Sequence, residues 1–109
     1  MPTPQNRPYK TRFTNADSTI VVGTDVPTGT EVVYIHWAAL VADGTNACSL
    51  EIEQPVTTVV AALRSAGTTS QFQAYDPPLR FDVLTTTTTV ITFDVAGTGA
   101  RYCVCWSWQ

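Results

Sequence analysis

The sequence predicts an all-β fold, an antiparallel β-sandwich of the jelly-roll kind with an extended N-terminal arm and at most one short helix. Threonine and valine are abundant, and these β-branched residues suit pleated strands and disfavour helices. Short apolar stretches alternate along the chain with turn-forming glycine, proline, asparagine and aspartate. About seven or eight short strands separated by such turn signals are typical of a sandwich or jelly roll.

The chain has 109 residues, a length that allows one hydrophobic core and not two. We therefore expect an arm over residues 1–12 and a single sandwich domain over residues 13–109. Charged residues make up only 14% of the chain, against about 25% in an average soluble domain. Little charge is thus left to cover the surface of an independent monomer.

The charge and hydropathy patterns argue against two classes of partner. A net charge of −3 does not suit a nucleic-acid surface, because such surfaces neutralise phosphates with clustered lysine and arginine. No apolar run approaches the ~20 residues that a membrane-spanning helix needs, and the N-terminal residues do not resemble a signal peptide. We expect synthesis in a cytoplasm and no membrane or nucleic-acid partner.

Residues 1–12 are predicted to form a basic, proline-rich arm. Proline removes backbone donors and keeps a chain extended, so the segment is expected to be neither a central strand nor a helix. Three of the six cations lie in it, and no acidic residue precedes Asp17. The arm could contact a neighbouring molecule or could be a frayed end of the domain. Its candidate contact residues are Pro4, Arg7, Pro8, Tyr9, Lys10 and Arg12.

A short strand at Ser18–Val22 and a turn-rich connection lead to the most hydrophobic segment, Glu31–Ala42. Regular alternation in that segment would place on one face Val33, Ile35, Trp37, Ala39 and Val41, and on the other Val32, Tyr34, His36, Ala38 and Leu40. Both faces are apolar, whereas a sandwich strand has only one face in the core. We expect a loop, the arm or another subunit to cover the second face.

The next segments give one regular strand and one ambiguous element. Ala47–Glu53 alternates as a half-buried strand does, with Cys48, Leu50 and Ile52 inward. Residues 55–65 have the apolar spacing of a helix, which favours one short helix there. Their threonine and valine content leaves another strand as the alternative.

The C-terminal third is predicted to contain four strands. Two short strands, Gln71–Tyr75 and Leu79–Leu84, flank a stiff corner at Asp76-Pro77-Pro78. Val90–Val95 and Ala100–Trp108 then alternate, and the last strand places on one face Tyr102, Val104, Trp106 and Trp108.

No catalytic or metal-binding constellation is evident in the sequence, so we expect a protein that is not an enzyme and has no cofactor. His36 is the single histidine, and no nucleophile or metal-pair motif surrounds it. Glu51 and Glu53 are expected on the solvated side of their strand. Cys103 and Cys105 lack the CxxC spacing of redox and zinc sites. Free thiols are favoured, with a bridge from Cys48 to one of these two cysteines as the alternative.

Aromatic side chains are the candidates for contact with a partner, either at a subunit interface or as a platform that stacks on a sugar. Trp106 and Trp108 are expected to be more exposed than Trp37, because they lie near the end of the chain. The predicted oligomer interface consists of Tyr34, His36, Ala38, Leu40, Trp106 and Trp108.

The C-terminal part of the chain resembles that of small single-domain bacteriophage virion proteins. The residues that carry the resemblance are Phe72, Pro77-Pro78-Leu79-Arg80-Phe81, Val90–Val95, Gly97-Thr98-Gly99 and Ala100-Arg101-Tyr102-Cys103-Val104. The resemblance implies a head decoration (cement) protein, a jelly roll that assembles as a homotrimer on the major capsid protein at the virion surface. A carbohydrate- or receptor-binding head of a tail or fibre protein, stacking through Trp106, Trp108 or Tyr75, is the alternative. The resemblance to the virion proteins implies no catalytic residue.

Overall fold

The structure is a computed structural model that describes residues 9–55 and 58–109. It confirms the all-β prediction, because two antiparallel sheets pack face to face and the described residues contain no helix. None of these residues therefore forms a helix that could cross a membrane. The strands are β1 (Tyr9–Thr14), β2 (Ser18–Val21), β3 (Val32–Val41), β4 (Cys48–Gln54), β5 (Thr58–Ser65), β6 (Gln71–Asp82), β7 (Thr89–Ala96) and β8 (Arg101–Trp108).

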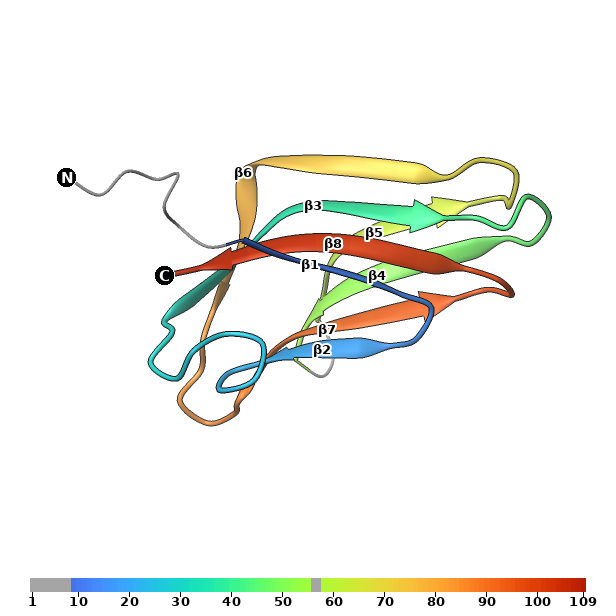
Figure 1. The fold of residues 1–109 in the computed structure, drawn as a ribbon. Helices are drawn as coiled ribbons and strands as arrows, with labels where there is room; N and C mark the ends of the chain where they lie inside the picture. The colour runs from blue at the N-terminus through green and yellow to red at the C-terminus, as the bar shows by residue number, and fades with distance from the viewer. Residues whose placement is uncertain (1–8, 56–57) are drawn as a thin grey trace.

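The strand order is that of a jelly roll. One sheet has the order β1-β8-β3-β6 and the other β2-β7-β4-β5 (Figure 1). Antiparallel partners are β1 with β8, β2 with β7, β3 with β6, and β4 with β5. The chain is thus equivalent to one long hairpin rolled into two sheets. The successive strands lie in alternate sheets, except for β4 and β5, which are paired in the same sheet.

The core lies between the sheets and is built from the inward positions of alternating strands. Leu50 and Ile52 of β4, and Phe93 of β7, are fully buried as their alternation predicted. Tyr102 of β8 is also fully buried, and its hydroxyl lies 2.5 Å from Ser18 Oγ and donates to the carbonyl oxygen of Ala16 at 3.1 Å. These bonds satisfy a polar group whose burial would otherwise destabilise the fold.

The predicted short helix at residues 55–65 is wrong, because Thr58–Ser65 forms strand β5, paired with β4. The segment follows the strand preference of its β-branched residues and not the helical spacing of its apolar residues. Val59 and Val60, which a helix over these residues would place on one apolar face, are 46% and 42% exposed.

Strand β3 contains a bulge that regular alternation could not predict. The register against β8 passes from Ile35↔Trp106 to Trp37↔Cys105, so His36 is the extra residue. Beyond the bulge the faces exchange, and Ala38 and Leu40 point into the core while Trp37 and Ala39 point outward. The expectation that Trp37, Ala39 and Val41 share a face with Val33 and Ile35 is therefore wrong.

Strand β6 replaces the two strands that were predicted at Gln71–Tyr75 and Leu79–Leu84. It is one element with a corner, visible in Figure 1, where two separate strands were predicted. The corner lies between Ala74 and Leu79, which pair with positions of β3 only two residues apart.

Candidate interaction surface

The last four residues of the predicted arm lie in strand β1, which begins at Tyr9 and pairs with β8. Tyr9, Lys10 and Arg12 therefore belong to the sandwich and not to an arm. The strand is an edge strand, the kind of position that tolerates nearby proline. The remaining candidate arm residues, Pro4, Arg7 and Pro8, lie outside the described part of the chain.

Arg12 is committed to contacts within the domain. Its guanidinium donates to Ser18 Oγ at 3.0 Å, to the carbonyl oxygen of Thr19 at 2.8 Å and to Asp25 Oδ1 at 2.7 Å. It also lies over the ring of Trp106, 5.1 Å from the centroid. Arg12 thus connects β1 to the second sheet, and its charge is paired with Asp25 of the same domain.

Lys10 has a similar role at the end of the same edge. Its Nζ donates to the carbonyl oxygen of Asp25 at 3.2 Å and lies 5.6 Å from the centroid of a Trp108 ring. The cation covers an indole that would otherwise meet water. Lys10 and Arg12 therefore screen the two tryptophans that the sequence offered as partner contacts.

Half of the predicted oligomer interface is wrong. Ala38 and Leu40 are 0% exposed and Trp106 only 2%, so these three belong to the core. The bulge turned the first two inward, and Trp106 follows the inward alternation of β8. Tyr34, His36 and Trp108 are half-buried.

Tyr34 and His36 lie on the outer surface near the C-terminus. The Tyr34 hydroxyl donates to Gln109 Oε1 at 2.9 Å. His36 Nε2 lies 2.6 Å from Ser107 Oγ, and the Tyr9 ring meets its imidazole edge-on with centroids 4.8 Å apart. These contacts join β1, β3 and β8 on their outer side.

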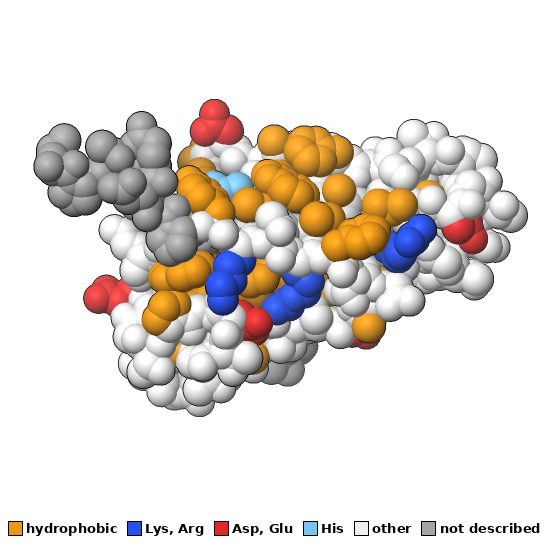
Figure 2. Space-filling model, in the orientation of Figure 1, with side chains coloured by type: hydrophobic (Ala, Val, Ile, Leu, Met, Phe, Trp, Pro, Cys, Tyr) orange, Lys and Arg blue, Asp and Glu red, His pale blue; other side chains and the backbone are white. Residues whose placement is uncertain are grey.

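Two rows of side chains cross the outer surface of the sheet β1-β8-β3-β6, and we call them the neutral face. Side chains paired across strands point the same way. The registers place in one row Phe13, Cys103, Ala39 and Phe72, and in the other Thr11, Cys105, Trp37 and Ala74. None of the eight is charged. Figure 2 shows the band of hydrophobic side chains on this side of the molecule.

The large side chains of the neutral face are exposed to an unusual degree for aromatic residues. Phe13 is 58% and Phe72 64% exposed, and the half-buried Trp37 lies beside Phe72 with ring centroids 5.8 Å apart. The sequence reasoning missed Phe13 and Phe72 and ranked Trp37 below Trp106. Phe72 stands between two glutamines in the sequence. An aromatic residue between polar neighbours could have indicated an exposed ring at that position.

The cysteines are free, as the favoured prediction stated. Cys48 is buried in the core, whereas Cys103 and Cys105 point outward on β8. Burial raises the pKa of both outward thiols, and for Cys105 the neighbouring Cys103 adds to the effect. Both thiols are thereby held in the protonated, weakly nucleophilic form.

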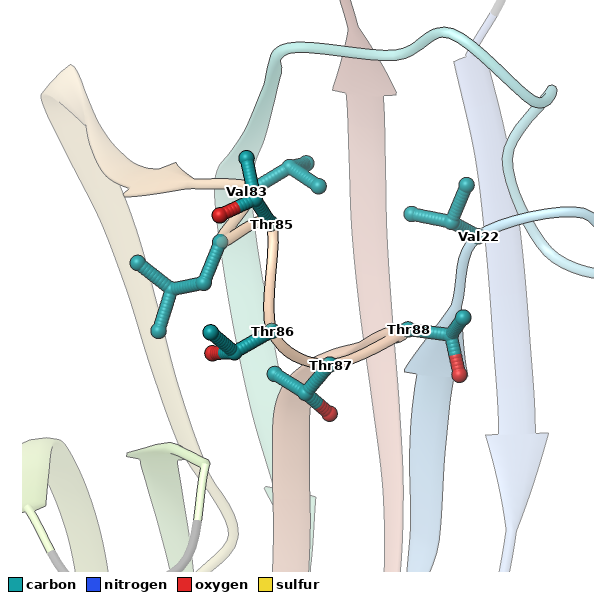
Figure 3. Close-up of a pocket in the computed structure, with 7 residues that line it drawn as sticks. Val22, Val83, Thr85, Thr86, Thr87 and Thr88 are labelled. Atoms are coloured by element: carbon teal, nitrogen blue, oxygen red, sulfur yellow. The ribbon is translucent and has the colours of Figure 1, made fainter.

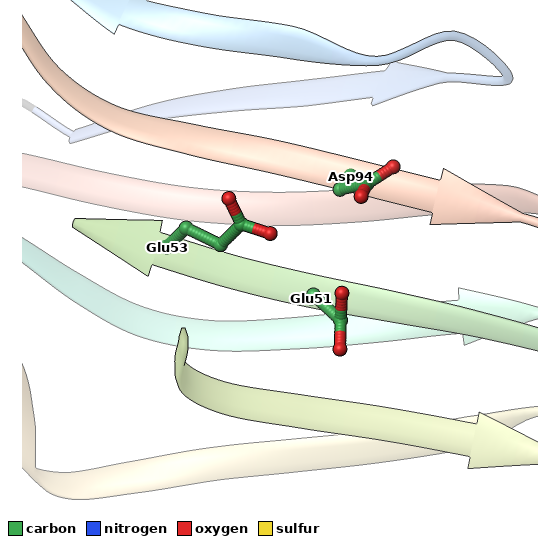
Figure 4. A group of neighbouring side chains, drawn as sticks. All are labelled: Glu51, Glu53 and Asp94. Atoms are coloured by element: carbon green, nitrogen blue, oxygen red, sulfur yellow. The ribbon is translucent and has the colours of Figure 1, made fainter. Parts of the chain in front are cut away.

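The outer surface of the second sheet has the opposite character. Glu51, Glu53 and Asp94 project from β4 and β7, with carboxylate oxygens within 4.8 Å of one another (Figure 4). Loss of solvent raises the pKa of Asp94, with further contributions from Asp17 and Glu51. Carboxylates grouped in this way could hold a cation. They are equally typical of a strand face in contact with water, which is what was predicted for Glu51 and Glu53.

A threonine-lined hollow lies at one end of the sandwich. Thr85, Thr86, Thr87 and Thr88 border it, with Val22, Val83 and Leu84 (Figure 3). Its lining has hydroxyl and methyl groups and no charged side chain. The described residues that line the hollow include no carboxylate, imidazole, amine or thiol. A threonine hydroxyl needs such a group beside it to act as a nucleophile.

Comparison with known proteins gives no match, whether against family models, curated proteins or solved structures. The resemblance to bacteriophage virion proteins therefore stays a prediction. The fold and the surfaces of the chain are what a functional proposal must be built on.

Proposed function

We propose that this chain is a structural subunit of a bacteriophage particle, in which it decorates the head. On this proposal it assembles in the host cytoplasm, forms a homotrimer and binds to the major capsid protein at the outer surface of the virion. The observation that carries the proposal is the contrast between the two outer surfaces of the sandwich, one neutral and aromatic, the other acidic.

The contrast supports an assembly role because the two surfaces suit different environments. A contiguous apolar patch on a small domain marks a contact with another molecule. The surface with Glu51, Glu53 and Asp94 carries charged groups, which are favourable in contact with water. A subunit that is covered on one side and faces water on the other has this distribution.

Residues 1–8 are proposed to contact the capsid, with Arg7 supplying a cation for an acidic lattice. The informative variant removes residues 1–8. Removing residues 1–12 would also delete most of β1, together with the Arg12 contacts.

The test uses heads that lack the protein, mixed with the purified chain and sedimented. We expect the full chain to occupy the heads and the variant without residues 1–8 to occupy them less. Equal occupancy by the two chains rejects the role of the arm. Failure of the full chain to bind heads, or its location on the tail in a cryo-EM map, rejects the decoration proposal.

Carbohydrate binding is the second candidate function, and one observation favours it. Trp37 and Phe72 form a partly exposed aromatic pair on the neutral face, and such rings can stack on sugars. The stacking residues first predicted fit less well, because Trp106 is buried and Trp108 and Tyr75 are half-buried. Quenching of tryptophan fluorescence by host glycans, lost in Trp37→Phe, would support this candidate.

A further inference from the structure

We infer that the neutral face is covered by a second copy of this chain. The inference rests on the proposed function, because it names the neighbour that this surface meets in an assembly. Three properties of the face carry it: its lack of charge, its area and the distribution of large and small side chains.

The lack of charge selects against most other partners. A nucleic acid or an acidic lattice would need cations, and the eight side chains of the two rows include none. Arg101 lies only at the margin, stacked on Phe13 at 5.6 Å. The acidic surface lies on the other sheet, so copies that turn their neutral faces toward the axis of a trimer keep their carboxylates apart.

The outer surface of the whole sheet β1-β8-β3-β6, with the neutral face at its centre, is close to the size of a stable contact between copies. A standard interface buries about 800 Å² on each partner, roughly an eighth of the 6161 Å² that this chain exposes. The sheet has four strands, which at ~4.8 Å spacing and ~3.3 Å per residue along β3 give about 600 Å² in projection. That projection covers the whole outer surface of the sheet. The two rows of the neutral face account for about 250 Å² of it, so they would form the apolar centre of the contact, and the remaining outer residues of the sheet would form its polar rim.

The side-chain sizes are complementary within one chain. Along the row of Phe13, Cys103, Ala39 and Phe72, the two aromatic rings lie on the edge strands and the small side chains lie between them. This row forms a shallow trough with raised ends. A second copy supplies rings of the right size, since its own Phe13 or Phe72 can fill the space over Ala39 and Cys103.

The experiment measures the mass of the purified full chain by light scattering across a micromolar concentration series. We expect a mass greater than that of one 11.8 kDa copy. Phe72→Glu should weaken the association on the order of tenfold or more, because it places an unpaired charge in an apolar contact. Val59→Glu is the matched control, since Val59 is also an exposed apolar residue, but on β5 of the other sheet.

Circular dichroism establishes that each variant is folded. If Phe72→Glu does not fold, Phe72→Gln continues the polar character of Gln71 and Gln73 and should also weaken association. A single-copy mass at every concentration overturns the inference, as does equal weakening by Val59→Glu. Monomers that still occupy heads overturn the inference and the homotrimer, but they leave head decoration standing. Self-associating chains that occupy no head overturn head decoration and leave the inference standing.

Discussion

At the scale of single residues, Arg12 has the most hydrogen bonds among the cations of residues 9–55 and 58–109. It donates to side-chain and backbone oxygens of Ser18 and Thr19 and pairs with Asp25 at 2.7 Å. Arg12 and Asp25 have side chains only 21% and 18% exposed, so the pair is better shielded than an ordinary surface salt bridge.

We predict that Arg12→Met lowers the free energy of unfolding by about 1–3 kcal/mol, because charge-assisted bonds are lost and Asp25 is left without its partner. Chemical denaturation measures the effect. Arg64→Met is the control, since Arg64 is 70% exposed and 3.6 Å from Glu51, and it should change stability by no more than about 0.5 kcal/mol. Equal losses would show that Arg12 is an ordinary surface cation.

Asp94 should have the opposite effect on stability. Its pKa is raised in the folded protein by loss of solvent and by Asp17 and Glu51, so the folded state binds a proton more tightly than the unfolded state does. Its contribution to stability is then present at acid pH, below 3.8, and is lost as the pH rises through the folded-state pKa.

We predict that Asp94→Asn raises stability at pH 7 by a few tenths of a kcal/mol, a usual size for surface charge effects. The gain should disappear on acidification, where wild-type Asp94 is itself protonated. Denaturation curves at pH 7 and pH 3 test this. A gain that persists at low pH would contradict the electrostatic cause. Asp82→Asn, which removes the partner of Arg80 at 3.2 Å, should give no gain.

At the scale of elements, the bulge in β3 decides which side chains form the neutral face. His36 is extra with respect to β8, and the residues on either side of it resume regular pairing. Removing His36 would join Ile35 to Trp37 and leave every later side chain on its present face.

We therefore predict that deletion of His36 leaves a folded protein, destabilised by about 1–2 kcal/mol through loss of the Ser107 and Tyr9 contacts. Deletion of Ala39 should cost more than about 3 kcal/mol, because it either turns Leu40 outward or drives Trp37 into the space of Ala38. Thermal unfolding compares the two chains. Similar melting temperatures would mean that β3 slips freely in its register.

Elements were predictable where one strand face alone is apolar. β4, β7 and β8 alternate, and the residues that share a face of each strand were identified from the sequence, although Trp106 and Trp108 of β8 were expected to meet a partner and not the core. β3 and β5 were not, because apolar residues on both sides of a strand remove the pattern that fixes its faces.

At the scale of the whole molecule, the two outer surfaces predict different responses to salt. Contacts through the neutral face should not weaken when sodium chloride rises from about 0.05 to 1 M, because salt screens charges and leaves apolar burial intact. Attachment to heads through Arg7 should weaken over the same range. Light scattering and sedimentation measure the two equilibria. Salt-induced dissociation of the copies would contradict a neutral interface.

The sequence by itself determined the fold class, because β-branched residues and regularly spaced turn signals leave no other way to bury one core in a chain of this length. It also favoured free cysteines, and it placed Tyr102, Val104, Trp106 and Trp108 on one face of β8. Only the tertiary structure decided which aromatic residues meet water. That outcome depends on a one-residue bulge at His36, and on Lys10 and Arg12 covering Trp108 and Trp106. Both depend on contacts between strands far apart in the chain, which local patterns do not encode.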